Sequence, residues 1–126
     1  MNPQSVSLAG KLGSDLKKEL SKVQEVEVVV APPFVYLESV ERSRGNTRTF
    51  SIGAQNVHSE KLGSHTGEVS LSMLQSFGVT HIILGHSERR AEGENDDAVN
   101  KKLFATIKGE LTGVVCVGES KRDHGG

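Results

Sequence analysis

The sequence from residue 81 to residue 90 is HIILGHSERR, and this stretch decides the fold. Its beginning, from His81 to Leu84, is short, continuous and rich in β-branched residues, which is typical of a parallel strand buried on both faces. Gly85 ends the strand, and a histidine and four other polar residues follow it. Because ligands bind at the carboxyl ends of parallel strands, we expect a functional site around His86.

Strands and helices alternate on both sides of this stretch. Short runs rich in β-branched residues predict strands over residues 26–31, 80–85 and 111–117, and a short run rich in small residues predicts one over residues 50–54. Apolar residues spaced by three and four predict helices over residues 5–23, 34–42, 69–77 and 96–108. Asn95 is placed to cap the last helix. This order predicts an α/β fold, with a parallel sheet and helical crossovers in a single domain over residues 1–126.

The composition limits the kinds of partner that the chain can have. Its 126 residues carry a formal net charge of −1, which gives no support to binding of nucleic acid or of an anionic membrane. No apolar run approaches the roughly 20 residues of a membrane span, and the N-terminus lacks the regions of a signal peptide. The single cysteine, Cys116, excludes an internal disulfide and fits a reducing compartment. We expect a soluble, cytoplasmic protein.

Five segments of the chain resemble one known family. They are VAPPF from residue 30, GAQN from residue 53, TGEVS from residue 66, GHSERR from residue 85 and CVGE from residue 116. In this order and at these spacings they resemble triosephosphate isomerase, and the match covers almost the whole chain. The resemblance implies interconversion of dihydroxyacetone phosphate and glyceraldehyde 3-phosphate, a step of glycolysis and gluconeogenesis that uses no cofactor. It also implies a TIM (β/α)8 barrel of about 250 residues, of which this chain is a half-barrel without the first strand.

The resemblance assigns catalytic roles to His86 and Glu88. In the family, the residue matching His86 polarises the substrate carbonyl and stays uncharged beside a helix N-terminus, which is known of these enzymes and is not deduced from this chain. A short turn or helix starting at Ser87 would aim free amides at the imidazole in the same way. Glu88 takes a supporting role. An alternative stays open for each residue. His86 is then correctly placed in the fold but catalyses no reaction, and Glu88 forms a structural ion pair with a nearby basic group. Arg89 and Arg90 are expected to be scaffold charges.

The resemblance also predicts an interface. The loop over residues 56–67 matches the family's loop that projects into the partner subunit, so Gln55, Thr66, Gly67 and Glu68 are expected to be interface residues. The predicted sheet supports association independently, because its edge strands carry β-branched residues and few charges. We therefore expect a homo-oligomer, at least a dimer.

Several catalytic parts of the family have no counterpart among these residues. The family's first strand reads Asn-Trp-Lys-Met-Asn, and this chain begins at the equivalent of its last two residues, Met1 and Asn2. The family's glutamate base, mobile lid and phosphate site lie beyond its fifth strand. We therefore expect no substrate-binding residue here, and an isolated chain that is inactive or nearly so. The alternatives are a self-assembling half-barrel with a structural or unrelated binding role, and a fragment of a longer enzyme.

No metal site is expected from residue spacing. His58, His65 and His81 match no tight ligand pattern, and the chain's only cysteine is far from them in sequence. The glycines between residues 63 and 67 do not form a phosphate-binding loop, because the Gly-Lys-Ser/Thr ending is missing. We expect neither a metal nor an organic cofactor.

Overall fold

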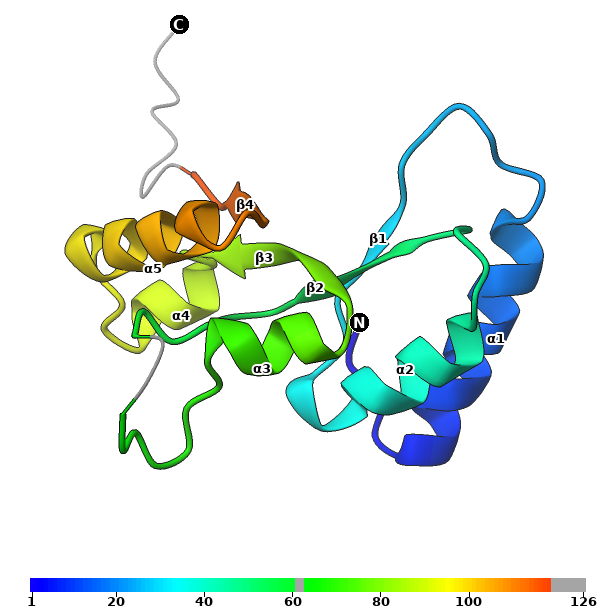
Figure 1. Cartoon of the computed structure of the whole chain (residues 1–126), viewed down its shortest axis with the longest axis horizontal. Coiled ribbons are helices and arrows are strands. Elements are labelled where there is room, and N and C mark those ends of the chain that lie inside the picture. Colours follow the sequence, from blue (N-terminus) through cyan, green and yellow to red (C-terminus); the bar gives the residue numbers. More distant parts are fainter. Residues whose placement is uncertain (61–62, 119–126) are drawn as a thin grey trace, which may run out of the picture.

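A parallel four-stranded sheet forms the centre of the protein. The computed structural model describes residues 1–60 and 63–118. The strands lie in the order of the sequence, and Figure 1 shows them between helices. They are β1 (Val29–Val30), β2 (Ser51–Ala54), β3 (Val79–Leu84) and β4 (Thr112–Val115). All three strand pairs are parallel, which confirms the predicted sheet and is consistent with part of a TIM barrel.

One helix precedes the first strand, and the other helices form the crossovers between strands. They are α1 (Val6–Leu20), the 3-10 helix η1 (Phe34–Tyr36), α2 (Leu37–Arg44), α3 (Leu71–Ser76), α4 (Ser87–Ala91) and α5 (Asp96–Lys108). The helices α1 and α2 pack against each other at one end of the molecule, and α4 and α5 lie at the other end (Figure 1). The side chains of Ser5, Ser70 and Asn95 cap α1, α3 and α5 by accepting from backbone amides. Within the described ranges, no helix is both long and apolar enough to cross a membrane.

The first strand differs most from its prediction. A strand was expected over residues 26–31, but β1 contains only Val29 and Val30. Val30 is buried against β2, whereas Val26 is 64% exposed. The carbonyl of Val28 still accepts from the amide of Ser51 (2.8 Å), but the ladder of this edge strand, which has a neighbour on one side only, does not extend to residues 26 and 27.

The core lies between the inner strands and the helices. Ile52 on β2 and Ile82 and Leu84 on β3 are almost completely buried. The buried apolar side chains are those of Ala9, Val30, Leu37, Val40, Phe50, Ile52, Ala54, Val57, Leu71, Leu74, Val79, Ile82, Leu84 and Val99. The carboxyl end of β3 is part of this core, because Leu84, its last residue, is buried. The segment that follows β3 therefore begins at a packed position.

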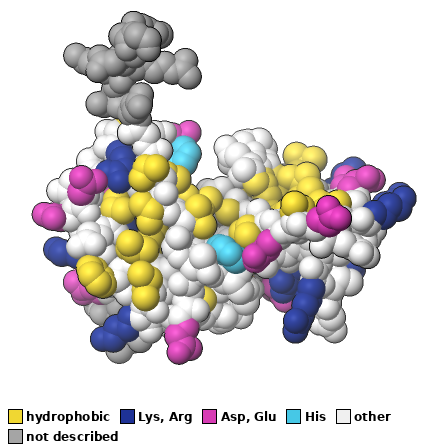
Figure 2. Space-filling model, turned by 90° about the horizontal axis from the view of Figure 1, so that it is seen from above, with side chains coloured by type: hydrophobic (Ala, Val, Ile, Leu, Met, Phe, Trp, Pro, Cys, Tyr) yellow, Lys and Arg dark blue, Asp and Glu magenta, His cyan; other side chains and the backbone are white. Residues whose placement is uncertain are grey.

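The last strand is left uncovered. Val114 and Val115 point to opposite faces of β4, yet they are 43% and 37% exposed. Parallel strands are normally covered on both faces. Figure 2 shows hydrophobic side chains gathered over α5 and β4, where Phe104 and Ile107 are also exposed. The strands β1 and β4 are thus the two edges of the sheet, and each has a neighbour on one side only among the described residues.

Candidate functional site

His86 lies at the carboxyl end of the central strand. Gly85 turns the chain with φ +65°, and His86 is the N-cap residue of α4. The backbone amide of Glu88 donates to Nδ1 of the imidazole (3.3 Å). A nitrogen that accepts carries no proton, so this bond fits the tautomer of the imidazole that has its proton on Nε2. The side chain is 45% exposed, so Nε2 is accessible as a donor.

Glu88 stands beside the histidine but interacts with it weakly. One carboxylate oxygen lies 3.6 Å from Nδ1 of His86, and the Glu88 side chain is 87% exposed. An ion pair would require a proton on the same Nδ1 that accepts from the backbone. We favour the amide bond, because an ion pair so exposed contributes little. The structure thus brings the two predicted catalytic residues together, but their chemistry stays a prediction.

Arg90 fixes the turn that carries the histidine. Its Nε donates to the carbonyl of Gly85 (2.8 Å), and its Nη1 donates to Asp96 at the start of α5 (2.7 Å). Gly85 is required here for two reasons. Its φ is positive, and a Cβ at this position would lie 2.9 Å from Nη2 of Arg90. Arg90 is therefore a scaffold charge, as predicted, and it ties the end of β3 to α5.

A buried polar cluster near this end of the sheet was missed by the sequence analysis. Lys102 on α5 forms an ion pair with Glu94 and donates to the side-chain oxygen of Asn56 (2.9 Å). The lysine and glutamate side chains are only 11% and 4% exposed. Lys102 is spaced three residues from Val99 and four from Thr106 on one helix face, and all three are buried. This spacing alone does not identify a buried lysine, because its partner Glu94 precedes the helix.

The four predicted interface residues occupy two places. Gln55 donates from its amide to the carbonyls of Ala31 and Met1 (both 3.0 Å), so it holds the N-terminal residues against the ends of the strands. Thr66, Gly67 and Glu68 form an exposed turn further along the loop, where Gly67 has φ +85°. The structure consists of a single chain, so the interface role of these four residues stays a prediction.

The loop between β2 and α3 brings together three side chains that sequence spacing kept apart. His58, Glu60 and His65 place their donor atoms within 4.8 Å of one another. His81 lies on β3 and faces Glu27 instead, with 3.6 Å between Nε2 and the carboxylate. The cluster depends on the path of the loop, which spacing alone cannot reveal. Glu119, the last residue of the CVGE segment, lies outside the described residues.

Comparisons with known proteins agree with the resemblance. The family model "Triosephosphate isomerase" matches residues 1–125. The chain is 47% identical to the triosephosphate isomerase of Alkaliphilus oremlandii over 114 residues, which are 90% of this chain and 45% of that protein. It is 40% identical to that of Idiomarina loihiensis over 117 residues (90% and 46%) and 40% identical to that of Sodalis glossinidius over 121 residues (95% and 47%). The chain spans about half the length of the curated relatives it matches.

Proposed function

The chain belongs to the triosephosphate isomerase family, and we propose that it supplies the histidine-bearing half of an active site for the interconversion of dihydroxyacetone phosphate and glyceraldehyde 3-phosphate. The observation that carries the proposal is the imidazole of His86, held at the carboxyl end of β3 with Nδ1 occupied by a backbone amide. This arrangement leaves Nε2 as a fixed donor in the place where parallel folds bind ligands.

In the proposed reaction, Nε2–H of His86 donates to the substrate carbonyl oxygen and stabilises the negative charge that develops there. Such a preorganised donor contributes about 10²–10³-fold to a rate. The reaction also needs a base that moves a proton between adjacent carbons. Glu88 is 87% exposed, so we give it a supporting role and not that of the base. The base, the lysine and the phosphate-binding groups that the family uses match no residue of this chain.

The 126-residue polypeptide is therefore proposed to be inactive until other barrel strands complete it. The exposed valines of β4 support this view, because in a closed barrel the interior and the outer helices cover both faces of each strand. The missing strands belong either to a longer form of the chain or to another polypeptide. A cytoplasmic location and a role in glycolysis and gluconeogenesis accompany the proposal, and Cys116, which is free, fits a reducing compartment.

A chimera tests the proposal directly. The segment of this chain that matches the Alkaliphilus oremlandii protein replaces the corresponding segment of that protein, which then supplies all the remaining strands. We expect isomerase activity in the chimera and a fall in kcat of about 10²–10³-fold on His86→Ala. The control is His81→Gln, because His81 lies on the same strand but away from its carboxyl end. A folded chimera that keeps its activity without the His86 imidazole would overturn the proposed role.

A self-assembling half-barrel is the second candidate function. It is favoured by the two sheet edges that lack a neighbour within the described part of the chain, because such edges pair readily with another molecule. In this case the chain has a structural or unrelated binding role. The chimera separates the two candidates, since a half-barrel that only assembles does not need His86.

A further inference from the structure

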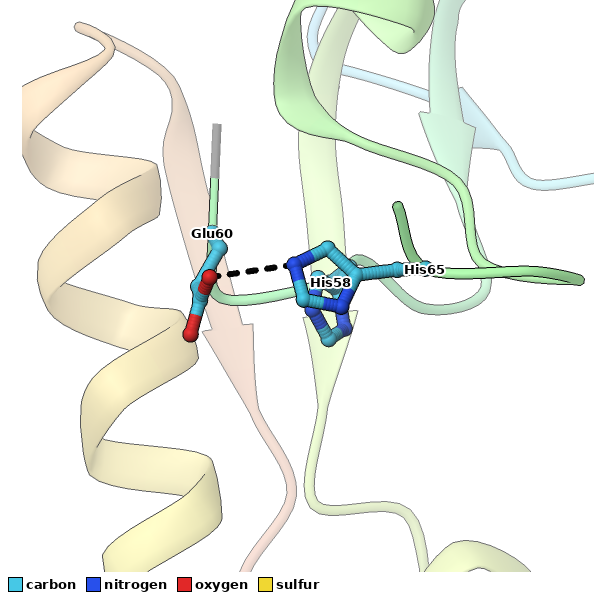
Figure 3. A group of neighbouring side chains, drawn as sticks. All are labelled: His58, Glu60 and His65. Carbon is cyan, nitrogen blue, oxygen red and sulfur yellow. Dashed lines mark hydrogen bonds and ion pairs between the residues drawn. The ribbon is translucent and has the colours of Figure 1, made fainter. Parts of the chain in front are cut away.

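The loop between β2 and α3 carries a group of metal-ligand side chains that is separate from His86. Figure 3 shows the side chains of His58, Glu60 and His65 turned toward one another. Nε2 of His65 lies 3.0 Å from a carboxylate oxygen of Glu60, and the two imidazole centroids are 4.2 Å apart. Three donors of the kinds that zinc prefers therefore meet at one place in the loop.

The distances between these donors suit a tetrahedral ion after small movements. Zinc holds nitrogen and oxygen ligands at about 2.0–2.2 Å, so neighbouring ligand atoms lie about 3.3–3.5 Å apart. The pair formed by Glu60 and His65 is already close to this separation, and no pair of donors exceeds 4.8 Å. Glu60 is 65% exposed and His65 is 34% exposed, so rotation of these side chains can close the remaining gap.

His58 has one nitrogen without a partner and one that faces a carboxylate. Its Nε2 is buried and makes no hydrogen bond within the described residues. Its Nδ1 lies 3.6 Å from a carboxylate oxygen of Glu68. A metal-bound histidine typically donates its other ring N–H to a carboxylate, which fixes the ring and raises its basicity. Glu68 is placed to do this for His58, and an ion would satisfy the buried Nε2.

Glycine leaves the space that such a site needs. Gly63 has φ +141°, and a Cβ at this position would lie 2.7 Å from Nε2 of His65. The ring nitrogen thus keeps an open approach. The same three residues line a cavity of about 170 Å³, together with Gly63, Glu68, Ser70, Ser72 and Met73. This is enough room for an ion and a water molecule.

We propose that this loop binds a divalent transition-metal ion, with zinc as the best fit, through Nε2 of His58, a carboxylate oxygen of Glu60 and Nε2 of His65. Glu68 orients His58 by accepting from Nδ1 of its ring, and a water molecule fills the fourth coordination position of the ion. Bound metal would hold the loop in one conformation beside the turn of Thr66 and Gly67. The site is independent of the isomerase proposal, because none of its residues takes part in the chemistry assigned to His86.

Zinc binding to the untagged, metal-free chain tests the proposal. Zn²⁺ is titrated in competition with a chromophoric chelator, and Co²⁺ serves as a second probe through the visible absorption of its four-coordinate form. We expect one ion per chain. His65→Ala and Glu60→Gln should each weaken zinc binding at least about tenfold, and Glu68→Gln should weaken it about tenfold through His58.

The variants are chosen so that loss of folding does not imitate loss of binding. Glu60→Gln preserves the shape of an exposed side chain, and circular dichroism checks each variant. The matched control is His81→Gln, which removes another histidine that faces a glutamate, and it should bind zinc as the parent chain does. The proposal is overturned if the parent chain binds zinc no more tightly than the double variant His58→Ala/His65→Ala. It is also overturned if binding is unchanged in Glu60→Gln and His65→Ala.

Discussion

The ammonium group of Lys102 and the carboxylate of Glu94 form an ion pair that is almost completely removed from solvent. Their side chains are 11% and 4% exposed, and Asn56 gives the lysine a second acceptor at 2.9 Å. One carboxylate oxygen of Glu94 is buried without a hydrogen-bond partner among the described residues. The pair joins α5 to the segment after α4, and Asn56 extends the connection to the end of β2. Burial makes the two charges depend on each other, because either one alone would be uncompensated.

Removing one charge of this pair should destabilise the fold strongly. Glu94→Gln leaves the lysine ammonium buried without its counter-ion, so we expect a loss of about 3–5 kcal/mol in the free energy of unfolding. Urea denaturation measures it. The exposed pair of Lys11 and Asp15 is the control, and Lys11→Met should cost about 0–1 kcal/mol. The double variant Lys102→Met/Glu94→Gln should be more stable than the sum of its single variants predicts. Simple additivity of the two changes would contradict the coupling.

A second prediction concerns the contact between Gly109 and Leu71. A Cβ on Gly109 would lie 2.1 Å from Cδ2 of Leu71, whose side chain is 2% exposed in the core. Gly109 has φ −83°, so its backbone tolerates any residue and the objection is steric alone. We expect Gly109→Ala to cost about 1–3 kcal/mol through overpacking, measured as a lower urea midpoint. Gly118→Ala is the control, since no atom of the described residues lies within 4 Å of its Cβ position. Equal midpoints for the two variants would mean that Leu71 moves aside freely.

The sequence predicted best those helices whose caps and apolar spacing lie within the helix itself. The helix α5 begins and ends at the predicted residues, because Asn95 supplies a side-chain cap and the apolar spacing runs to Lys108. The buried face of α5 follows the apolar spacing only in part. Val99, Leu103 and Ile107 carry that spacing, but Ile107 is 58% exposed, and Lys102 and Thr106 are buried. A lysine on the buried face is recognisable only when its partner Glu94 is known to lie beside it.

The candidate site was predicted in part for a similar reason. His86 and Glu88 are neighbours in sequence after a strand, so their proximity follows from the turn at Gly85 and the start of α4. The grouping of His58, Glu60 and His65 depends on how the loop returns on itself, and glycines with positive φ at positions 63 and 67 permit that path. Residue spacing contains no information about such a return.

The isolated chain should show no isomerase activity. Among its residues only His86 and Glu88 have assigned catalytic roles, and a barrier reduction of about 8 kcal/mol or more requires a base and substrate-holding groups as well. A coupled turnover assay on purified chain should give the same rate for the parent and for His86→Ala. A parent rate well above that of the variant would mean that an assembly of the chain replaces the missing groups.

Small phosphorylated substrates should bind weakly. The family's phosphate-holding segments match no residue here, and the loop over residues 63–67 lacks the lysine of a phosphate-binding loop. We expect calorimetry with dihydroxyacetone phosphate to give a Kd no tighter than about 1 mM, which corresponds to about −4.1 kcal/mol. A tighter value that survives His86→Ala would reveal a phosphate site outside the proposed one.

The last prediction concerns assembly through the uncovered edge of the sheet. Val114 and Val115 on β4 are 43% and 37% exposed, and an unpaired β-branched edge invites pairing with another strand. We expect the isolated chain to form a homo-oligomer, at least a dimer, when light scattering measures its mass at micromolar concentrations. Val115→Lys places a charge on this edge and should shift the mass toward that of one chain. Val35→Lys is the control, because Val35 is 78% exposed on η1, which is not part of β4. A folded and stable monomer of the parent chain would exclude edge pairing, and an oligomer unaffected by Val115→Lys would move the interface to β1 or to the loop of Thr66.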